Sequence, residues 1–156
     1  MRVLYPPVPV PHYLDPSKLL FLAGSIEMGK AERWQEKIAT SLNNINVTLL
    51  NPRRLDWDSS WQQSPDNPEF NKQVNWELNG IERAGLIVFY FDPNTQSPIT
   101  LMELGYAAGL KKKSIIYCPE SFWRSGNVEI LVDRNQEVFK MVDSYEELVS
   151  EVIKNF

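Results

Sequence analysis

The chain has very little of two residue types that carry much enzyme chemistry. Its 156 residues include one cysteine, Cys118, and one histidine, His12, which lies in a proline-rich N-terminal segment. A single cysteine excludes an internal disulfide, and the two residues together leave too few ligands for a His/Cys zinc site. A Ser-His-Asp or Cys-His mechanism would need His12 to fold back into a site. We therefore expect no cofactor, and carboxylates, hydroxyls, tyrosines and arginines remain as the catalytic groups.

Long apolar runs and an excess of basic charge are also missing. No run approaches the roughly 18 apolar residues of a membrane-spanning helix, and residues 1–15 have neither the basic start nor the apolar centre of a signal peptide. The 16 Lys and Arg residues are outnumbered by 20 Asp and Glu residues, so the net charge is -4. Binding to the negatively charged backbone of a nucleic acid requires a positively charged surface. We expect a cytoplasmic protein with no nucleic-acid polymer and no membrane as partner.

The first residues are rich in proline. Five of the 11 prolines fall within the first 16 residues, which favours an extended, polyproline-like segment over a helix. We therefore divide the chain into a proline-rich arm, residues 1–17, and a single α/β domain, residues 18–156. The arm is expected to lie on the body of the domain or on a neighbouring subunit, and a flexible terminus is the alternative.

From residue 18 onward, short apolar runs alternate with helical stretches, which is the pattern of βαβ units on a parallel sheet. Strands are expected at residues 19–23, 47–50, 86–91 and 114–118, with a short fifth strand at 137–141. Helices are expected at residues 31–43, 69–84 and 98–110, with an irregular stretch or short helix at 119–134. Asp143 and Glu146 have the spacing of a capping box and predict the start of the last helix.

The segment from Leu86 to Leu110 is the most informative part of the chain. An apolar strand leads through the polar residues DPNTQS into a helix, whose start is marked by Ser97 as N-cap and Pro98 at the first helical position. Loops at the carboxyl ends of parallel strands are where open α/β sheets bind their ligands. One acid, Glu103, lies within this helix and is a candidate reactive group.

Helical periodicity gives the 98–110 helix two apolar faces. The sheet-facing stripe, in which a glycine would allow close approach, consists of Leu101, Leu104, Gly105 and Ala108. Glu103 is predicted to point away from this stripe. Its neighbours on that side are also apolar and comprise Ile99, Met102, Tyr106 and Ala107. A second subunit covering that side would leave Glu103 in a pocket, and a solvated helix glutamate is the alternative.

Several segments together resemble one family. They are FLAGSIE at the end of the first strand, LNGIERAGLIVFYFD, MELGYA around Glu103, and a later Asn127. Over about residues 19–130 the chain resembles the nucleoside 2-deoxyribosyltransferase superfamily, which includes the 2-deoxynucleoside 5-phosphate N-glycosidases. The resemblance implies a flavodoxin- or Rossmann-like doubly wound sheet of about five parallel strands. It also implies a homo-oligomer with shared active sites, because Asn127 matches a residue that relatives lend to the neighbouring subunit's sugar site; in isolation, Gly126-Asn127 is a turn.

The resemblance further implies cleavage of an N-glycosidic bond by a retaining double displacement. The Glu103 carboxylate would attack the anomeric carbon as the nucleobase leaves, forming a glycosyl-Glu103 ester. A second nucleobase as acceptor makes the enzyme a transferase, whereas water makes it an N-glycosidase of nucleosides or their 5-monophosphates. A non-catalytic nucleotide-binding module on the same fold is the alternative from another class.

Three more positions bear on this chemistry. Asp92, at the end of the 86–91 strand, is the expected acid for the departing base, with an Asp-Pro turn as its alternative role. Glu77 matches a family carboxylate that precedes Leu-Asn-Gly-Ile, and is otherwise a solvated helix residue. A family tyrosine that orients the nucleophile falls on Phe21, which cannot donate a hydrogen bond, so Tyr106, Tyr90 or another donor would replace it.

The turn at Gly24 and Ser25 resembles the element that cradles the 5-phosphate in the nucleotide hydrolases. Glu27 follows closely and would repel a phosphate. Four basic residues could compensate for that charge, namely Lys30, Arg33, Arg53 and Arg54. We favour a free nucleoside as substrate over its monophosphate.

The loop over residues 51–68 is longer than the usual connection, which favours a functional role. Arg53-Arg54 at its start is expected near the mouth of the site, or else as a surface pair bonded to a nearby acid such as Asp56. Trp57 and Trp61 could stack a nucleobase, or pack the loop onto the body.

Overall fold

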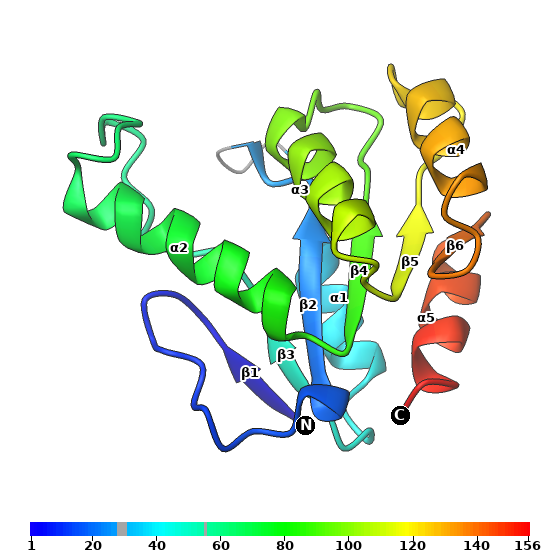
Figure 1. The fold of residues 1–156 in the computed structure, drawn as a ribbon, viewed down its shortest axis with the longest axis horizontal. Helices are drawn as coiled ribbons and strands as arrows, with labels where there is room; N and C mark the ends of the chain where they lie inside the picture. The colour runs from blue at the N-terminus through cyan, green and yellow to red at the C-terminus, as the bar shows by residue number, and fades with distance from the viewer. Residues whose placement is uncertain (28–30, 55) are drawn as a thin grey trace.

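The structure is a computed structural model that describes residues 1–27, 31–54 and 56–156. Its centre is a six-stranded parallel sheet with the order β1-β3-β2-β4-β5-β6 (Figure 1). The strands are β1 (Arg2–Leu4), β2 (Leu19–Gly24), β3 (Thr48–Leu50), β4 (Leu86–Tyr90), β5 (Ser114–Tyr117) and β6 (Phe139–Val142). The expected flavodoxin- or Rossmann-like α/β class is confirmed.

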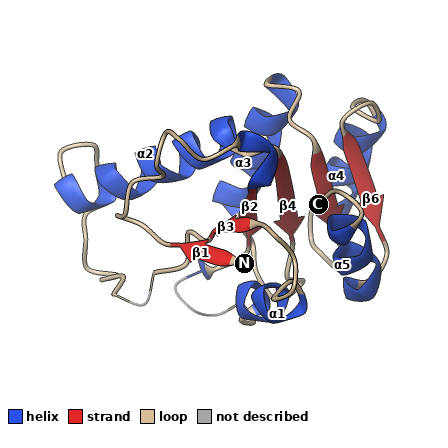
Figure 2. Cartoon of the chain, turned by 90° about the horizontal axis from the view of Figure 1, so that it is seen from below, coloured by secondary structure: helices blue, strands red, loops and turns tan. Residues whose placement is uncertain are grey.

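Helices cover both faces of the sheet. They are α1 (Trp34–Ser41), α2 (Pro68–Arg83), α3 (Pro98–Gly109), α4 (Ser125–Asp133) and α5 (Tyr145–Ile153), with a short 3-10 helix at Pro16–Lys18. Figure 2 shows α2 and α3 on one side of the sheet and α1 on the other. Within the described residues, no helix is long and apolar enough to cross a membrane.

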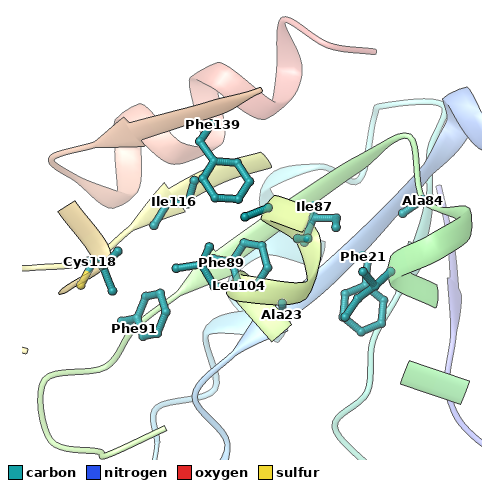
Figure 3. Close-up of a cluster of buried hydrophobic side chains, with 14 of the residues drawn as sticks. Phe21, Ala23, Ala84, Ile87, Phe89, Phe91, Leu104, Ile116, Cys118 and Phe139 are labelled. Atoms are coloured by element: carbon teal, nitrogen blue, oxygen red, sulfur yellow. The ribbon is translucent and has the colours of Figure 1, made fainter. Parts of the chain in front are cut away.

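Alternate residues of the central strands supply the two cores. On β2, Phe21 and Ala23 belong to the cluster beneath α2, α3 and α4, whereas Leu20 and Leu22 belong to the cluster beneath α1 and α5. Figure 3 shows Phe21 and Leu104 in the first of these clusters. Because both faces are covered, the strands are continuous apolar runs.

The N-terminal arm contributes a strand that we did not expect, so the sheet has six strands and the expectation of about five is corrected. Arg2 pairs with Thr48, and β1 thereby extends the sheet beyond β3. The following prolines hide this strand from pattern analysis, because three residues are too few to show alternation.

The rest of the arm lies on the body of the domain. The indole Nε1 of Trp76 on α2 donates to the carbonyl of Val8 at 2.8 Å. The Arg83 guanidinium donates to the carbonyls of Val10 at 2.5 Å and Pro11 at 2.9 Å. The arm is therefore docked on α2, as Figure 1 shows for the blue segment.

The capping box of α5 lies one residue later than predicted. Ser144 is the N-cap, and its Oγ accepts from the Glu147 N–H at 3.1 Å, while Glu147 Oε2 accepts from the Asp143 N–H at 2.9 Å. The prediction of Asp143 with Glu146 is wrong because Ser144 and Glu147 have the same spacing, and spacing alone does not distinguish the pairs.

Candidate active site

The carboxyl ends of β2 and β4 come together at the start of the site. Gly24 ends β2, and a Cβ atom there would lie 2.5 Å from both the Trp34 ring and the Tyr90 carbonyl oxygen. The next residue, Ser25, donates its N–H to that same carbonyl at 2.9 Å. Glycine is therefore needed for the close approach of the two strands, and Ser25 is placed against the loop that follows β4.

Three buried hydroxyls join that loop to Ser25. The Oγ atoms of Ser25 and Ser97 lie 2.5 Å apart, and Thr95 Oγ1 lies 2.9 Å from the first and 2.8 Å from the second. Ser25 Oγ also accepts from the backbone N–H of Asp92 at 2.9 Å. We call Ser25, Thr95 and Ser97 the hydroxyl cluster, and it holds the β4–α3 loop on the end of β2.

A residue from outside the helix binds the backbone directly before α3. Ser97 is the N-cap position, as predicted, but it has a φ of 47° and its side chain makes no capping hydrogen bond. The Glu27 carboxylate instead accepts from the backbone N–H groups of Gln96 and Ser97, the latter at 2.5 Å. A carboxylate at this end of a helix is favoured by the helix dipole.

Glu103 belongs to the buried face of α3, which corrects the predicted stripe. The buried residues of the helix are Thr100, Glu103, Leu104, Ala107 and Ala108. Gly105 is exposed, and a Cβ atom there would have no neighbour within 4 Å, so it does not allow a close approach to the sheet. Compared with the prediction, the buried face of α3 is shifted around the helix so that it includes Glu103 and Ala107 and leaves out Gly105.

Glu103 and Glu77 form a pair of carboxyls in poor contact with water. Glu103 is 6% exposed, and burial, with a smaller contribution from the Glu77 charge, raises its pKa well above the usual value. Burial likewise raises the pKa of Glu77, on α2, to about 7. Both shifts favour the protonated form, so near neutral pH the site holds a proton that ordinary carboxyls would have lost.

Gln73 connects this pair to the end of β3. Its Nε2 donates to Glu77 Oε1 at 2.7 Å and to the Pro52 carbonyl at 3.0 Å. The bond to Glu77 opposes part of the rise in its pKa. Gln73 lies one helical turn before Glu77, so the i, i+4 spacing was the signal that sequence reasoning missed.

Asp92 follows β4, as predicted, and its side chain shapes the loop. Its Oδ1 accepts from the N–H and the side-chain amide of Asn94 at 2.9 and 3.0 Å, and its Oδ2 accepts from the Glu32 N–H at 3.1 Å. These are the bonds of a turn-forming aspartate. Its role as the catalytic acid stays a prediction.

The aromatic residues considered around the nucleophile occupy different layers. Phe21 is fully buried against α2, with its ring 6.3 Å from that of Trp76. The Tyr106 hydroxyl donates to Glu82 at 2.5 Å, and the Tyr90 hydroxyl donates to Glu32. Among the described residues, no hydrogen bond reaches the Glu103 carboxyl, so the donor that would replace the family tyrosine is not one of these.

The two arginines after β3 have separate roles. Arg53 donates to the carbonyls of Glu32 and Ala31 at 2.8 and 3.2 Å and to Gln35, which ties this segment to the start of α1. Arg54 forms a two-bond pair with Asp56, the acid expected in the alternative, but its side chain is only 5% exposed and so is not at the surface.

The tryptophans of the long loop pack on each other near Arg54. The rings of Trp57 and Trp61 meet edge to face with centroids 5.1 Å apart, and the Arg54 guanidinium lies 5.1 Å from the Trp61 ring. Stacking of a nucleobase on Trp57 stays a prediction. Among the basic residues considered for phosphate, Lys30 lies outside the described residues.

Asn127 lies on α4 and faces a cavity of about 320 Å³ between α3 and α4. The cavity is lined by Leu101, Leu104, Arg124, Asn127, Val128 and Leu131. Asn127 itself is exposed. Its contribution to a neighbouring subunit's site stays a prediction.

Comparison with known proteins places this geometry in a family. Residues 17–122 match the family described as "Nucleoside 2-deoxyribosyltransferase like". No curated protein matches the sequence. Solved structures share the fold, including the following two. The CMP N-glycosidase BcmB of Clostridium botulinum is 17% identical, with a TM-score of 0.54 and coverage of 86% of this chain and 98% of that one. A conserved protein from Enterococcus faecalis V583 is 13% identical, with a TM-score of 0.65 and coverage of 89% and 99%. The chain therefore belongs to the nucleoside 2-deoxyribosyltransferase-like family.

Proposed function

We propose that this protein is an enzyme that cleaves the N-glycosidic bond of a nucleoside, with Glu103 as the nucleophile. The observation that carries the proposal is the buried Glu103 on α3 together with Glu77 on α2, the charge of which contributes to raising the Glu103 pKa. Perturbed carboxyls of this kind are typical of catalytic sites. Family membership supports the same chemistry, and a structurally similar protein is described as a CMP N-glycosidase.

In the proposed reaction, the ionised Glu103 oxygen forms a bond to the anomeric carbon. The bond between that carbon and the base nitrogen breaks, and its electron pair leaves with the base, which takes up a proton from an acid. The acceptor, a second base or water, then attacks the same carbon, gives its proton to the acid that was deprotonated in the first step, and releases the Glu103 carboxylate. Two displacements return the starting configuration at that carbon.

As the acid that protonates the departing base, we propose Glu77 ahead of Asp92. An acid works best when its pKa lies near the working pH, and the pKa of Glu77 is about 7. The oxygens of Asp92, in contrast, already accept bonds from Asn94 and Glu32. Asp92 is the second candidate, and comparing Glu77→Gln with Asp92→Asn on substrates with good and poor leaving bases distinguishes them. The variant of the true acid should lose most on poor leaving bases.

We further propose that a second copy of the chain covers the face of α3 and α4. Ile99 and Met102 on α3 are each 55% exposed, and Ile130 on α4 is 63% exposed. Exposed apolar side chains gathered in this way indicate an interaction surface. Asn127 lies on the same helix as Ile130, which would let it reach a neighbouring site. A monomer in sedimentation at micromolar concentration would contradict this proposal.

The experiment for the proposed function is base exchange. The protein is incubated with a 2′-deoxynucleoside and a different free base, and the products are separated by chromatography. The exchanged nucleoside identifies a transferase, and free sugar with no exchange identifies an N-glycosidase. Intact-mass measurement after rapid acid quenching should show a glycosyl adduct that Glu103→Gln lacks. Binding of the nucleoside without any product would instead support the non-catalytic alternative.

A further inference from the structure

The N-terminal arm binds α2 along the part of the helix that carries Glu77. The carbonyl of Val8 in the arm accepts from the Trp76 indole at 2.8 Å, and Trp76 directly precedes Glu77 in the chain. Arg83, about two turns further along the helix, donates to two arm carbonyls at 2.5 and 2.9 Å. The arm precedes residues 17–122, which match the family, so one partner of each bond lies outside the matched part of the chain.

The body of the domain supports α2 through a close contact with β2. A Cβ atom on Gly80 would lie 2.7 Å from the Phe21 ring and 3.6 Å from the Leu50 side chain, so the helix lies directly on the sheet at this point. The Phe21 ring is also 6.3 Å from that of Trp76, which is 6% exposed. Trp76 therefore packs toward the body with its ring and binds the arm with its N–H group.

A second connection runs from the arm to Glu77 through the end of β3. The carbonyl of Leu4 in β1 accepts from the Asn51 N–H at 2.9 Å, which fixes the segment that follows β3. The carbonyl of the next residue, Pro52, accepts from Gln73 Nε2 at 3.0 Å, and the same Nε2 donates to Glu77 Oε1 at 2.7 Å. The arm thus contacts both the helix that carries Glu77 and the segment that helps to hold its side chain.

We propose that Trp76 and Arg83 are positioning residues, through which the arm holds Glu77 near Glu103 in the geometry needed to protonate the departing base. The proposal rests on the proposed function, in which Glu77 is the acid. Figure 1 shows that the first turns of α2 extend beyond the sheet, so the helix depends on contacts such as those of the arm to keep its place. A displacement of about 1 Å in a catalytic group can cost on the order of 10²-fold in rate.

The activity test uses the full chain with Trp76→Phe or Arg83→Met, which remove the donor groups but keep an aromatic ring or an aliphatic side chain. Each variant should lower kcat for base release about tenfold and leave KM within about twofold of wild type, because the acid moves while the groups that bind substrate stay in place. Arg83→Lys keeps one donor and should retain more of the rate than Arg83→Met. Two controls should keep the wild-type kcat, namely Arg134→Met at an exposed position after α4 and Ser144→Ala at the cap of α5.

Titration of the Glu77 carboxyl separates this proposal from the proposed function, because it requires no turnover. The side-chain ¹³C chemical shifts are followed against pH in Glu103→Gln, alone and with Trp76→Phe or Arg83→Met added. The Glu77 resonance is identified by its loss in Glu77→Gln. Burial raises the pKa of Glu77 to about 7. A less tightly held α2 should admit water to this carboxyl and lower its titration midpoint by about 0.5 or more on the pH scale.

A Glu77 midpoint that neither arm variant changes overturns the proposal, whatever the activity of wild type. An equal decrease in the Arg134→Met or Ser144→Ala control also overturns it, since the change would then not depend on the arm. In an active enzyme, a kcat that Trp76→Phe and Arg83→Met leave unchanged has the same meaning. A lowered midpoint in a protein that cleaves no nucleoside supports the hold of the arm on Glu77 and counts against the proposed function alone.

Discussion

Two carboxyl groups near α3, Glu27 and Glu103, have opposite surroundings in the protein. Glu27 accepts two backbone N–H bonds at the positive end of the helix, where its charge is stabilised. Glu103 lies in the second turn of α3 and is buried. Its burial, with a smaller contribution from the charge of Glu77, raises its pKa. Glu27 holds the β4–α3 loop through its two bonds. Glu103 is a poorly solvated carboxyl, which loses little by forming a neutral ester.

The largest expected effect comes from changing Glu103, the reactive carboxyl of the two. Glu103→Gln should reduce turnover by on the order of 10³-fold or more, because an amide cannot form the glycosyl ester. Release of the base, followed by chromatography, measures it. Glu146→Gln makes the same chemical change on an exposed part of α5 and should retain the wild-type rate. A Glu103→Gln protein that turns over at the wild-type rate would remove Glu103 from the mechanism.

The next prediction concerns pH and stability. The pKa of Glu77 is about 7 in the folded protein against an ordinary value of 4.5, so the folded state binds more protons than the unfolded state in this interval. Wild type should therefore lose stability as the pH rises from about 4.5 to above 7. Glu77→Gln removes the cost of ionisation and should be more stable than wild type by about 3 kcal/mol near pH 8.5, since about 2.5 pKa units correspond to that free energy.

Denaturant unfolding at both pH values measures this difference. The advantage of Glu77→Gln should disappear near pH 4.5, where the wild-type carboxyl is protonated in the folded protein. Glu146→Gln, at an exposed position, should show the same difference from wild type at both pH values. An advantage of Glu77→Gln that does not change with pH would mean that packing, and not the charge, is responsible.

A smaller effect on stability is expected at the hydroxyl cluster, which holds the loop that binds Glu27. Thr95→Val keeps the shape of the side chain but removes the hydroxyl that contacts Ser25, Ser97 and the Asp92 carbonyl. The remaining buried polar groups lose a partner, so the free energy of unfolding should fall by about 1–3 kcal/mol. Thr40→Val on α1, where the hydroxyl is exposed, should cost clearly less. Equal losses for the two variants would mean that the cluster does not hold the loop.

The smallest effect on stability is expected at α5, where the N-cap Ser144 is a neighbour in the chain, whereas Glu27 binds the start of α3 from a distant segment. Ser144→Ala removes the side chain that caps α5 through the Glu147 N–H and should lower the free energy of unfolding by about 1 kcal/mol. Ser150→Ala, at an exposed position in the same helix, is the control and should change it by a few tenths. Unfolding by denaturant measures both. An equal loss in the two variants would show that the Ser144 hydroxyl does not act as a cap.

Much of the fold follows from patterns between near neighbours in the chain. Apolar runs alternating with amphipathic stretches predicted β2 to β6 and the helices between them, and Ser97-Pro98 marked the start of α3 correctly. Glu103 was placed in that helix for the same reason. The three-residue β1 carries no such pattern, and it forms only because β3 offers an open edge.

The arrangement of the candidate site depends on contacts between distant parts of the chain. The packing of α3 on the body buried Glu103 and left Gly105 exposed, and α2 brought Glu77 near enough for its charge to raise the Glu103 pKa. Glu27 reaches Ser97 across 70 residues, which no local spacing reveals. Local patterns therefore predict which elements form, because neighbours in the chain decide hydrogen bonding and periodicity. The environment of each carboxyl was decided only by tertiary packing, because the groups that bury it, donate to it or carry a charge near it come from distant parts of the chain.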